Sequence, residues 1–269
     1  MMNLNDLFGL EGRVALVTGG SRGIGRMIVE GLLAAGAERV YIVARKQEQV
    51  DETASELGDK VVGLVGDLSQ MDGIQQLADE IAKREDKLDI LVNNAGAAWG
   101  EPFEEFSEAG WHRTMDLNVK TPFFLTQKLF PLLKKAGTKD RPAKVLMIAS
   151  IDGMKTNPWP TYPYQASKAG LIHLTRRMAA ELVQHNIIVN GIGPGAFPSA
   201  MNRAARDNAD MVEKGIPSRR VGVTEDMAGG AIYLLSRAGD YVVGTTIAID
   251  GGVVNANVGA GNFVDPSGE

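Results

Sequence analysis

The sequence predicts an α/β protein built on one doubly wound, parallel sheet of seven strands with helices on both faces. Two observations predict this class. Short apolar runs rich in β-branched residues alternate with segments of helical periodicity almost to the end of the chain, as in repeated βαβ units. The apolar runs are also hydrophobic along nearly their whole length, which is typical of strands covered on both faces.

Each element is expected from its own pattern. Seven segments combine β-branched residues with an unbroken apolar run and are predicted to be strands: 13–18, 39–44, 60–65, 88–93, 144–150, 187–192 and 246–250. Six segments carry apolar residues at helical spacing and are predicted to be helices: 24–35, 47–57, 71–84, 111–135, 164–184 and 225–236.

The whole chain, residues 1–269, is expected to be a single domain, because no Pro/Ser-rich linker, repeat or low-complexity tract interrupts the alternation. Two segments do not follow the alternation of strands and helices. Residues 197–223 are longer than ordinary strand-to-helix connections and are interpreted as a lid or substrate-binding segment. Residues 253–269, rich in Gly, Asn and Ala, are interpreted as a frayed tail or an arm that docks on a neighbouring subunit.

Composition argues against several classes of protein. The chain has no cysteine and only three histidines, far apart in sequence, so we expect no disulfide, no thiolate chemistry and no metal site. A net charge of −5 disfavours nucleic-acid binding. No apolar run approaches the ~20 residues that a membrane-spanning helix needs, and the N-terminus lacks a signal-peptide pattern. We therefore expect a cytoplasmic protein without membrane contact.

A glycine-rich loop follows the first predicted strand and leads into a helix. Glycine permits positive φ and close backbone approach, and a helix N-terminus presents N–H groups to an anion. This context makes a dinucleotide site in a Rossmann-type sheet a better interpretation than a merely tight turn. The residues expected to contact the pyrophosphate region are Gly19, Ser21, Arg22, Gly23, Ile24 and Gly25.

The end of the second strand predicts NADP(H) as the cofactor. An acidic residue there would bind the ribose 2′-hydroxyl of NAD, whereas arginine accommodates a 2′-phosphate. This chain has Arg45 and Lys46 at that place, and Arg22 offers a second cation. The alternative is that Arg45 and Lys46 only begin a solvated helix.

A phenol and an ammonium stand one helical turn apart at Tyr164 and Lys168. A nearby cation, together with a positively charged nicotinamide ring, is expected to lower the pKa of the phenol from about 10 toward the working range. Tyr162 lacks such a partner, because its i+4 residue is Ala166. The alternative interpretation is an ordinary surface Tyr and Lys.

Other polar residues and glycines fall where predicted strands end. Ser150 ends the fifth strand, where its hydroxyl could hydrogen-bond a substrate carbonyl, and Asn118 lies in the long helix before that strand. Further positions at strand ends are Asp67, Asn94, Ala95, Gly96, Gly193, Pro194 and Gly195. Because open α/β sheets bind ligands at the carboxyl ends of their strands, we expect these positions to share one crevice.

With these motifs (TGxxxGxG, NNAG and YxxxK), residues 10–252 resemble the short-chain dehydrogenases/reductases. The resemblance implies that Tyr164 is the general acid in reduction and that Lys168 lowers its pKa and binds the nicotinamide ribose. It implies that Ser150 orients the carbonyl and that Asn118 holds a water in a proton relay. It also implies cofactor contacts for Asp67, Leu68, Asn94, Ala95, Gly96, Pro194, Gly195, Phe197 and Ser199.

Two features near the expected substrate entrance differ from the pattern common in the family or have no assigned role. Ser150 precedes Tyr164 by 14 residues, where 13 is common in the family, and Pro158 and Pro160 lie between them. A longer loop there is expected to reshape the entrance without abolishing the catalytic group. Trp99 and Trp159 follow the fourth and fifth strands and are candidates for the substrate wall, although both could be packing groups.

Within the family, TGGSRGIG, the Arg after the second strand and YQASK look most like 3-oxoacyl-[acyl-carrier-protein] reductases, including the rhamnolipid-associated type. The resemblance implies a cytoplasmic homotetramer that reduces a ketone with NADPH, with a small-molecule or acyl-thioester substrate, as in fatty acid biosynthesis. Two alternatives are an NAD(P)-dependent alcohol, sugar or polyol dehydrogenase and a non-catalytic NADPH sensor. A sensor would often lack Tyr or Lys of the YxxxK motif, and both are present here.

Overall fold

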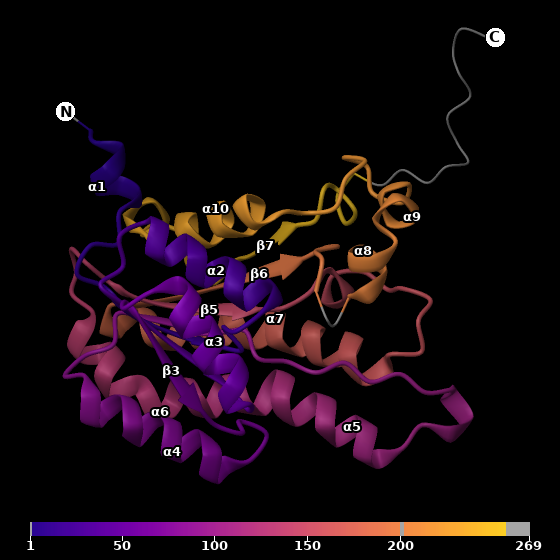
Figure 1. Cartoon of the computed structure of the whole chain (residues 1–269), viewed down its shortest axis with the longest axis horizontal. Helices are drawn as coiled ribbons and strands as arrows, with labels where there is room; N and C mark the ends of the chain where they lie inside the picture. The colour runs from indigo at the N-terminus through magenta and orange to yellow at the C-terminus, as the bar shows by residue number, and fades with distance from the viewer. Residues whose placement is uncertain (1, 200–201, 257–269) are drawn as a thin grey trace, which may run out of the picture.

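The computed structural model describes residues 2–199 and 202–256 and confirms the predicted fold class. One parallel sheet has the strand order β3-β2-β1-β4-β5-β6-β7 (Figure 1). The strands are β1 (Val14–Thr18), β2 (Arg39–Ala44), β3 (Val61–Val65), β4 (Ile90–Asn93), β5 (Ala143–Ile148), β6 (Ile187–Pro194) and β7 (Thr246–Ile249). The order reverses between β1 and β4, and such a reversal opens a crevice at the carboxyl ends of the strands.

Helices cover both faces of the sheet (Figure 1). Their bounds are α1 (Leu4–Phe8), α2 (Gly23–Ala34), α3 (Gln47–Leu57), α4 (Met71–Arg84), α5 (Glu108–Met115), α6 (Thr121–Ala136), α7 (Tyr162–Leu182), α8 (Arg203–Asp207), α9 (Ala209–Glu213) and α10 (Thr224–Leu235). The core has two halves because side chains alternate across a strand. On β1, Leu16 packs in the half with α4, α6 and α7, whereas Ala15 and Val17 pack in the half with α2 and α10.

The long helix predicted over 111–135 is interrupted. A π-helical turn, Asp116–Lys120, joins α5 to α6, and Asn118 is fully buried within it. Pro122 contributes to the irregularity, because proline has no N–H to donate to the carbonyl of Asn118 four residues earlier. The Thr121 hydroxyl donates to the Leu68 carbonyl at 2.6 Å and also lies 3.1 Å from the Asp116 carbonyl oxygen of the turn.

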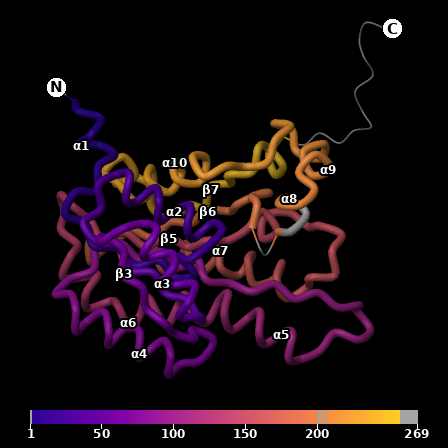
Figure 2. Tube along the Cα trace, viewed as in Figure 1, coloured from indigo at the N-terminus to yellow at the C-terminus, as the bar shows by residue number. Residues whose placement is uncertain are grey.

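Three short helices escaped prediction, because five residues are too few to show a helical period. These are α1, at the N-terminus, and α8 and α9, within the segment interpreted as a lid. Figure 2 traces this segment from the end of β6 through α8 and α9 to α10. Residues 200–201 of the segment and 257–269 of the expected tail lie outside the described residues. Among the described helices, none is both long and apolar enough to cross a bilayer.

Candidate active site

The glycine loop after β1 presents an open helix N-terminus. Gly19 and Gly23 have φ angles of +66° and +53°, values that side-chain-bearing residues rarely adopt. A Cβ on Gly25 would lie 2.2 Å from the Gly19 carbonyl oxygen, so the first turn of α2 needs glycine to fold back on the loop. The helix begins without a side-chain cap. Loop and helix therefore fit a phosphate group, which backbone N–H groups can bind.

Hydrogen bonds between β1 and β4 fix the base of this loop. The Thr18 hydroxyl oxygen accepts the N–H groups of Asn94 and Ala95, both at 2.9 Å. The Asn94 side chain donates back to the carbonyls of Thr18 and Gly19, at 2.8 and 3.2 Å. Asn94 thus holds the loop at the reversal of strand order, in the position predicted for a cofactor-cleft residue.

A second hydrogen bond to the loop was not expected from the sequence. The buried Thr53 hydroxyl on α3 lies 3.0 Å from the Ser21 carbonyl oxygen and 2.8 Å from the Gln49 carbonyl oxygen, so its single proton is shared between the loop and its own helix. Ser21 itself is buried, so its part of the loop lies against the protein. The signal that could have revealed Thr53 is a polar residue on the apolar face of a predicted helix.

Two arginines flank the outer side of the loop. Arg22 and Arg45 are exposed, and neither side chain makes a hydrogen bond or ion pair within the described ranges 2–199 and 202–256. The Ser69 N–H lowers the pKa of the nearby Asp67 carboxyl, and the charge of Arg45 lowers it further. Arg45 and Asp67 are therefore neighbours, as expected from the pairing of Ala44 with Val65 in adjacent strands. The side chain of Leu68 is buried in the core.

Three predicted catalytic side chains converge at the ends of β5 and α7. The Lys168 ammonium donates to the carbonyl of Ile148, the last residue of β5, at 2.8 Å. It lies 5.6 Å from the centre of the Tyr164 ring, and the Ser150 hydroxyl is close enough to Tyr164 to favour its phenolate form. The structure thus brings together a proton donor, a second hydroxyl and a cation.

Burial shifts the two titratable groups of this cluster toward their neutral forms. Burial raises the pKa of Tyr164 to about 12, with a contribution from the Asp152 carboxylate, while the polar Ser150 side chain nearby opposes the rise. Burial lowers the pKa of Lys168 to about 8, against the opposing effect of Asp152. The pKa of Tyr164 is therefore raised in the protein without cofactor, where the sequence predicted a lowering, because burial disfavours the phenolate and Lys168 does not offset this effect.

Asn118 connects the loop after β4 to α7. Its side-chain oxygen accepts the Ala97 N–H at 2.8 Å, and its amide group donates to the Ala97 carbonyl and to the Ser167 hydroxyl, both at 2.9 Å. Ser167 in turn donates to the Tyr164 carbonyl at 2.8 Å. The side chain of Asn118 is thereby engaged with protein groups, and Ser167 is a bridging residue that the sequence suggested only as a helix hydroxyl.

Glycines allow the close approach of these elements. A Cβ on Gly96 would lie 3.0 Å from the Asn118 side-chain oxygen and 3.6 Å from the Lys168 nitrogen. A Cβ on Gly153 would lie only 2.5 Å from the carbonyl carbon of Lys168. Residues Ile151–Gly153 form a 3-10 turn that starts from Ser150, so this contact fixes the position of Ser150 relative to α7.

The segment after β6 returns to the glycine loop. Pro194 ends β6, and a Cβ on the next residue, Gly195, would lie 2.6 Å from the Asp250 Cα. The Ser199 Cβ would be 3.2 Å from a Cβ on Gly23, so Ser199 lies beside the glycine loop as expected for a cofactor contact. Phe197 is only 2% exposed, which places its ring inside the protein.

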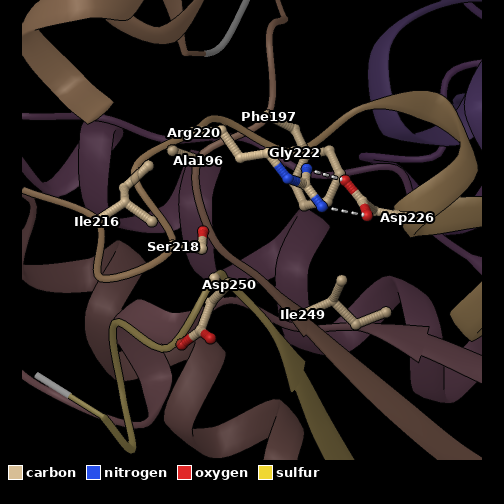
Figure 3. A pocket seen from close by; sticks show the side chains of 10 residues that line it. Ala196, Phe197, Ile216, Ser218, Arg220, Gly222, Asp226, Ile249 and Asp250 are labelled. Atoms are coloured by element: carbon tan, nitrogen blue, oxygen red, sulfur yellow. Dashed lines mark hydrogen bonds and ion pairs between the residues drawn. The ribbon is translucent and has the colours of Figure 1, made fainter. Parts of the chain in front are cut away.

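Phe197 lines a small cavity of about 110 Å³ between the proposed lid and β7 (Figure 3). Arg220 crosses one side of this cavity and donates two hydrogen bonds to the Asp226 carboxylate at the start of α10. Asp226 also accepts the Val223 N–H at 2.9 Å. The far end of the segment 197–223 is thus tied to α10.

The loops after β4 and β5 lie side by side at the rim of the site. The Glu101 N–H donates to the Pro160 carbonyl at 3.2 Å. Trp159 is 68% exposed and stays a candidate for the substrate wall, whereas Trp99 packs against Gly110 with the Arg113 guanidinium 4.9 Å from its ring centre. Of the two tryptophans, Trp99 is therefore a packing group.

Comparisons with known sequences point to one family. A family model described as short chain dehydrogenase matches residues 13–210. The chain is 44% identical over 255 residues to the rhamnolipids biosynthesis 3-oxoacyl-[acyl-carrier-protein] reductase of Pseudomonas aeruginosa, covering 93% of this chain and 99% of that protein. It is 37% identical over 249 residues to 2-dehydro-3-deoxy-D-gluconate 5-dehydrogenase of Escherichia coli, covering 91% and 96%.

Solved structures give the same picture. The Pseudomonas aeruginosa RhlG/NADP active-site complex superposes with a TM-score of 0.89 at 44% identity, covering 94% of this chain and 100% of that chain. A gluconate 5-dehydrogenase from Burkholderia cenocepacia, in complex with NADP and tartrate, gives a TM-score of 0.85 at 33% identity, covering 93% and 98%.

Proposed function

The chain belongs to the short-chain dehydrogenase family, and from this premise we propose that it reduces a ketone to a secondary alcohol with NADPH. The observation that carries the proposal is the convergence of Ser150, Tyr164 and Lys168 at the carboxyl edge of the sheet. The glycine loop, whose helix N-terminus is open to a phosphate, follows β1 at the same edge of the sheet.

We assign the cofactor to the crevice between β1 and β4. The glycine loop (Gly19, Ser21, Arg22, Gly23, Ile24, Gly25) would hold the pyrophosphate, and Arg22 and Arg45 would hold the 2′-phosphate, since both arginines are exposed and have a free guanidinium within the described chain. Asp67 and Leu68 would border the adenine, and Asn94, Ala95, Gly96, Pro194, Gly195, Phe197 and Ser199 would border the rest. When bound, NADPH supplies the hydride.

The protein's own groups would supply orientation and the proton. Ser150 would hydrogen-bond the substrate carbonyl oxygen, and Tyr164 would donate its phenolic proton to that oxygen as negative charge develops. A pKa of about 12 keeps Tyr164 protonated at neutral pH, which suits an acid in the reductive direction. Lys168 would bind the nicotinamide ribose and favour loss of the Tyr164 proton. Because the Asn118 side chain is engaged with Ala97 and Ser167, Asn118 would hold the water of a relay that returns the proton through its backbone.

We propose a 3-oxoacyl thioester as the substrate. The relative at 44% identity is named as a 3-oxoacyl-[acyl-carrier-protein] reductase, which supports this class and a role in fatty acid biosynthesis. A sugar-acid dehydrogenase is the second candidate, because relatives at 34% and 37% identity are named for gluconates. We further propose a single-domain, cytoplasmic homotetramer that associates through its long helices and last strand, with 197–223 as a lid.

A substrate and cofactor panel tests the proposal. Acetoacetyl thioesters and 5-ketogluconate would be offered with NADPH and with NADH, and cofactor oxidation followed by absorbance. We expect the thioester with NADPH to give the highest kcat/KM. A higher value for 5-ketogluconate would favour the second candidate, and no oxidation of NADPH with either ketone would contradict a reductase.

A further inference from the structure

We propose that Asp152 makes this site select ketones that are uncharged next to the carbonyl, such as 3-oxo esters and thioesters, over 3-oxo carboxylates. The inference rests on the proposed function, because it names the substrate class of the same catalytic group. Its starting point is a carboxylate that lies two residues after Ser150 and has no role in the mechanism described above.

The backbone places Asp152 at the catalytic group. Its N–H donates to the Ser150 hydroxyl oxygen at 3.1 Å, in the 3-10 turn that directly follows β5. The next residue, Gly153, packs so closely on α7 that a Cβ there would lie 2.5 Å from the Lys168 carbonyl carbon. The turn that carries Asp152 is therefore held between Ser150 and Lys168.

The Asp152 side chain is half-buried and has no ion pair or side-chain hydrogen bond within the described residues 2–199 and 202–256. The titratable and charged groups on α7 near this turn are Tyr164 and Lys168, with His173 and Arg176 farther along the helix. The other strand packed against the turn, β6, contributes no charged side chain. The negative charge is thus not neutralised by an ion pair in the described part of the chain, and the ammonium of Lys155, in the same turn, donates to the Val253 carbonyl instead.

Both catalytic groups respond to this charge. Asp152 contributes to raising the pKa of Tyr164 and opposes the lowering of the pKa of Lys168. A carboxylate that influences both groups will also act on a substrate that Ser150 and Tyr164 hold by its carbonyl oxygen. A second negative charge on a carbon close to that carbonyl would be repelled, whereas an ester or thioester at the same place would not.

The test compares two ketones that differ in this one charge. Ethyl acetoacetate and acetoacetate share the 3-oxo group, and kcat/KM for each would be measured with NADPH in the wild type and in Asp152→Asn. The variant keeps the backbone N–H to Ser150 and removes only the charge. We expect the ester-to-acid ratio of kcat/KM to fall by about tenfold in Asp152→Asn, the change that about 1.4 kcal/mol of lost repulsion gives.

Two further variants separate charge from structure. Asp152→Glu keeps the charge and should keep a ratio closer to that of the wild type. Asp140→Asn removes an exposed charge from the loop at the other end of β5 and should leave the ratio unchanged. An unchanged ratio in Asp152→Asn, or an equal fall in Asp140→Asn, would overturn the proposal.

If neither ketone is reduced, that result counts against the proposed function alone. A pH titration of Tyr164, which needs no turnover, then still tests the effect of Asp152. Phenolate absorbance of Tyr164, taken as the difference between each protein and its Tyr164→Phe counterpart, gives the midpoint of its ionisation. We expect that midpoint at lower pH in Asp152→Asn than in the wild type, because the carboxylate that disfavours phenolate is gone. An identical midpoint in both would show that Asp152 does not act on the site.

Discussion

At the scale of single residues, the site depends on two groups whose neutral forms are favoured by burial. The pKa of Tyr164 rises to about 12 and that of Lys168 falls to about 8. The YxxxK spacing predicted that the two side chains would meet on one helix face, and the structure places them together. The spacing could not predict the pKa shifts, because burial depends on β5 and the loop after it.

The pKa of Lys168 predicts a pH dependence. Its ammonium charge is present below pH 8 and is lost as the pH rises through about 8. Because kcat/KM for NADPH reports ionisations of the free enzyme, we expect this constant to fall through the same range, while Tyr164 keeps its proton. A profile that stays flat to about pH 10 would show that Lys168 keeps an ordinary pKa.

The close packing of Gly153 against α7 is expected to hold Ser150 in position. A Cβ there would lie 2.5 Å from the Lys168 carbonyl carbon, so Gly153→Ala must move the turn that follows Ser150. Because small displacements of catalytic groups are costly, we expect kcat to fall by about tenfold or more, with a smaller effect on KM. The matched control is Gly170→Ala, on α7 with open space where its Cβ would lie, which should leave kcat unchanged. Equal kcat in both variants would remove Gly153 from this role.

At the scale of elements, periodicity located the strands and long helices but missed local irregularities. The prediction of one helix over 111–135 missed the π-helical turn that buries Asn118. A proline at 122 was the available signal, since it cannot donate to the Asn118 carbonyl. The five-residue helices α8 and α9 had no periodic signal to detect, so the internal structure of 197–223 could not be read from sequence.

The start of α10 gives a prediction about stability. Hydrogen bonds from Arg220 and the Val223 N–H lower the pKa of Asp226 to about 2, from an ordinary value of 3.8. A lowered carboxylate pKa adds stability that is present above about pH 4 and disappears as the pH falls through about 2. We expect Asp226→Asn to lower the free energy of unfolding at neutral pH by about 1 kcal/mol, as loss of a helix cap does, and by progressively less as the pH falls toward about 2.

Urea unfolding at several pH values measures this difference. Asp59→Asn, which removes an exposed aspartate in the turn before β3, serves as the control and should not change the free energy of unfolding. A deficit of Asp226→Asn that does not shrink as the pH falls would contradict a role for the ionised carboxylate.

At the scale of the whole molecule, the two edges of the sheet differ. The carboxyl edge carries the glycine loop and the catalytic group, whereas buried ion pairs lie toward the amino edge. Asp89, 1% exposed, precedes β4, accepts the Val14 N–H at 3.0 Å and pairs with Arg13 at 3.4 Å. The sequence predicted the functional edge from strand-end motifs, but not these pairs, because they join residues far apart along the chain.

We therefore expect substitutions at the amino edge of the sheet to lower the free energy of unfolding without changing kcat. Asp89→Asn leaves the buried Arg13 without its charged partner, which we expect to lower the free energy of unfolding by about 3 kcal/mol. kcat of the folded protein should be unchanged, since the pair is remote from Tyr164. Chemical denaturation and steady-state kinetics on the same preparation check both statements, and a large loss of kcat at full folding would contradict them.

The most direct test of the central claim is NADPH oxidation by Tyr164→Phe with an acetoacetyl thioester, measured beside NADPH binding by fluorescence. The variant keeps the ring but loses the proton that we assign to the carbonyl oxygen. We predict unchanged NADPH binding and a fall in kcat by several orders of magnitude, about 10²–10⁴-fold. Turnover close to that of the wild type would contradict the assignment of Tyr164 as the acid and with it the mechanism proposed for this site.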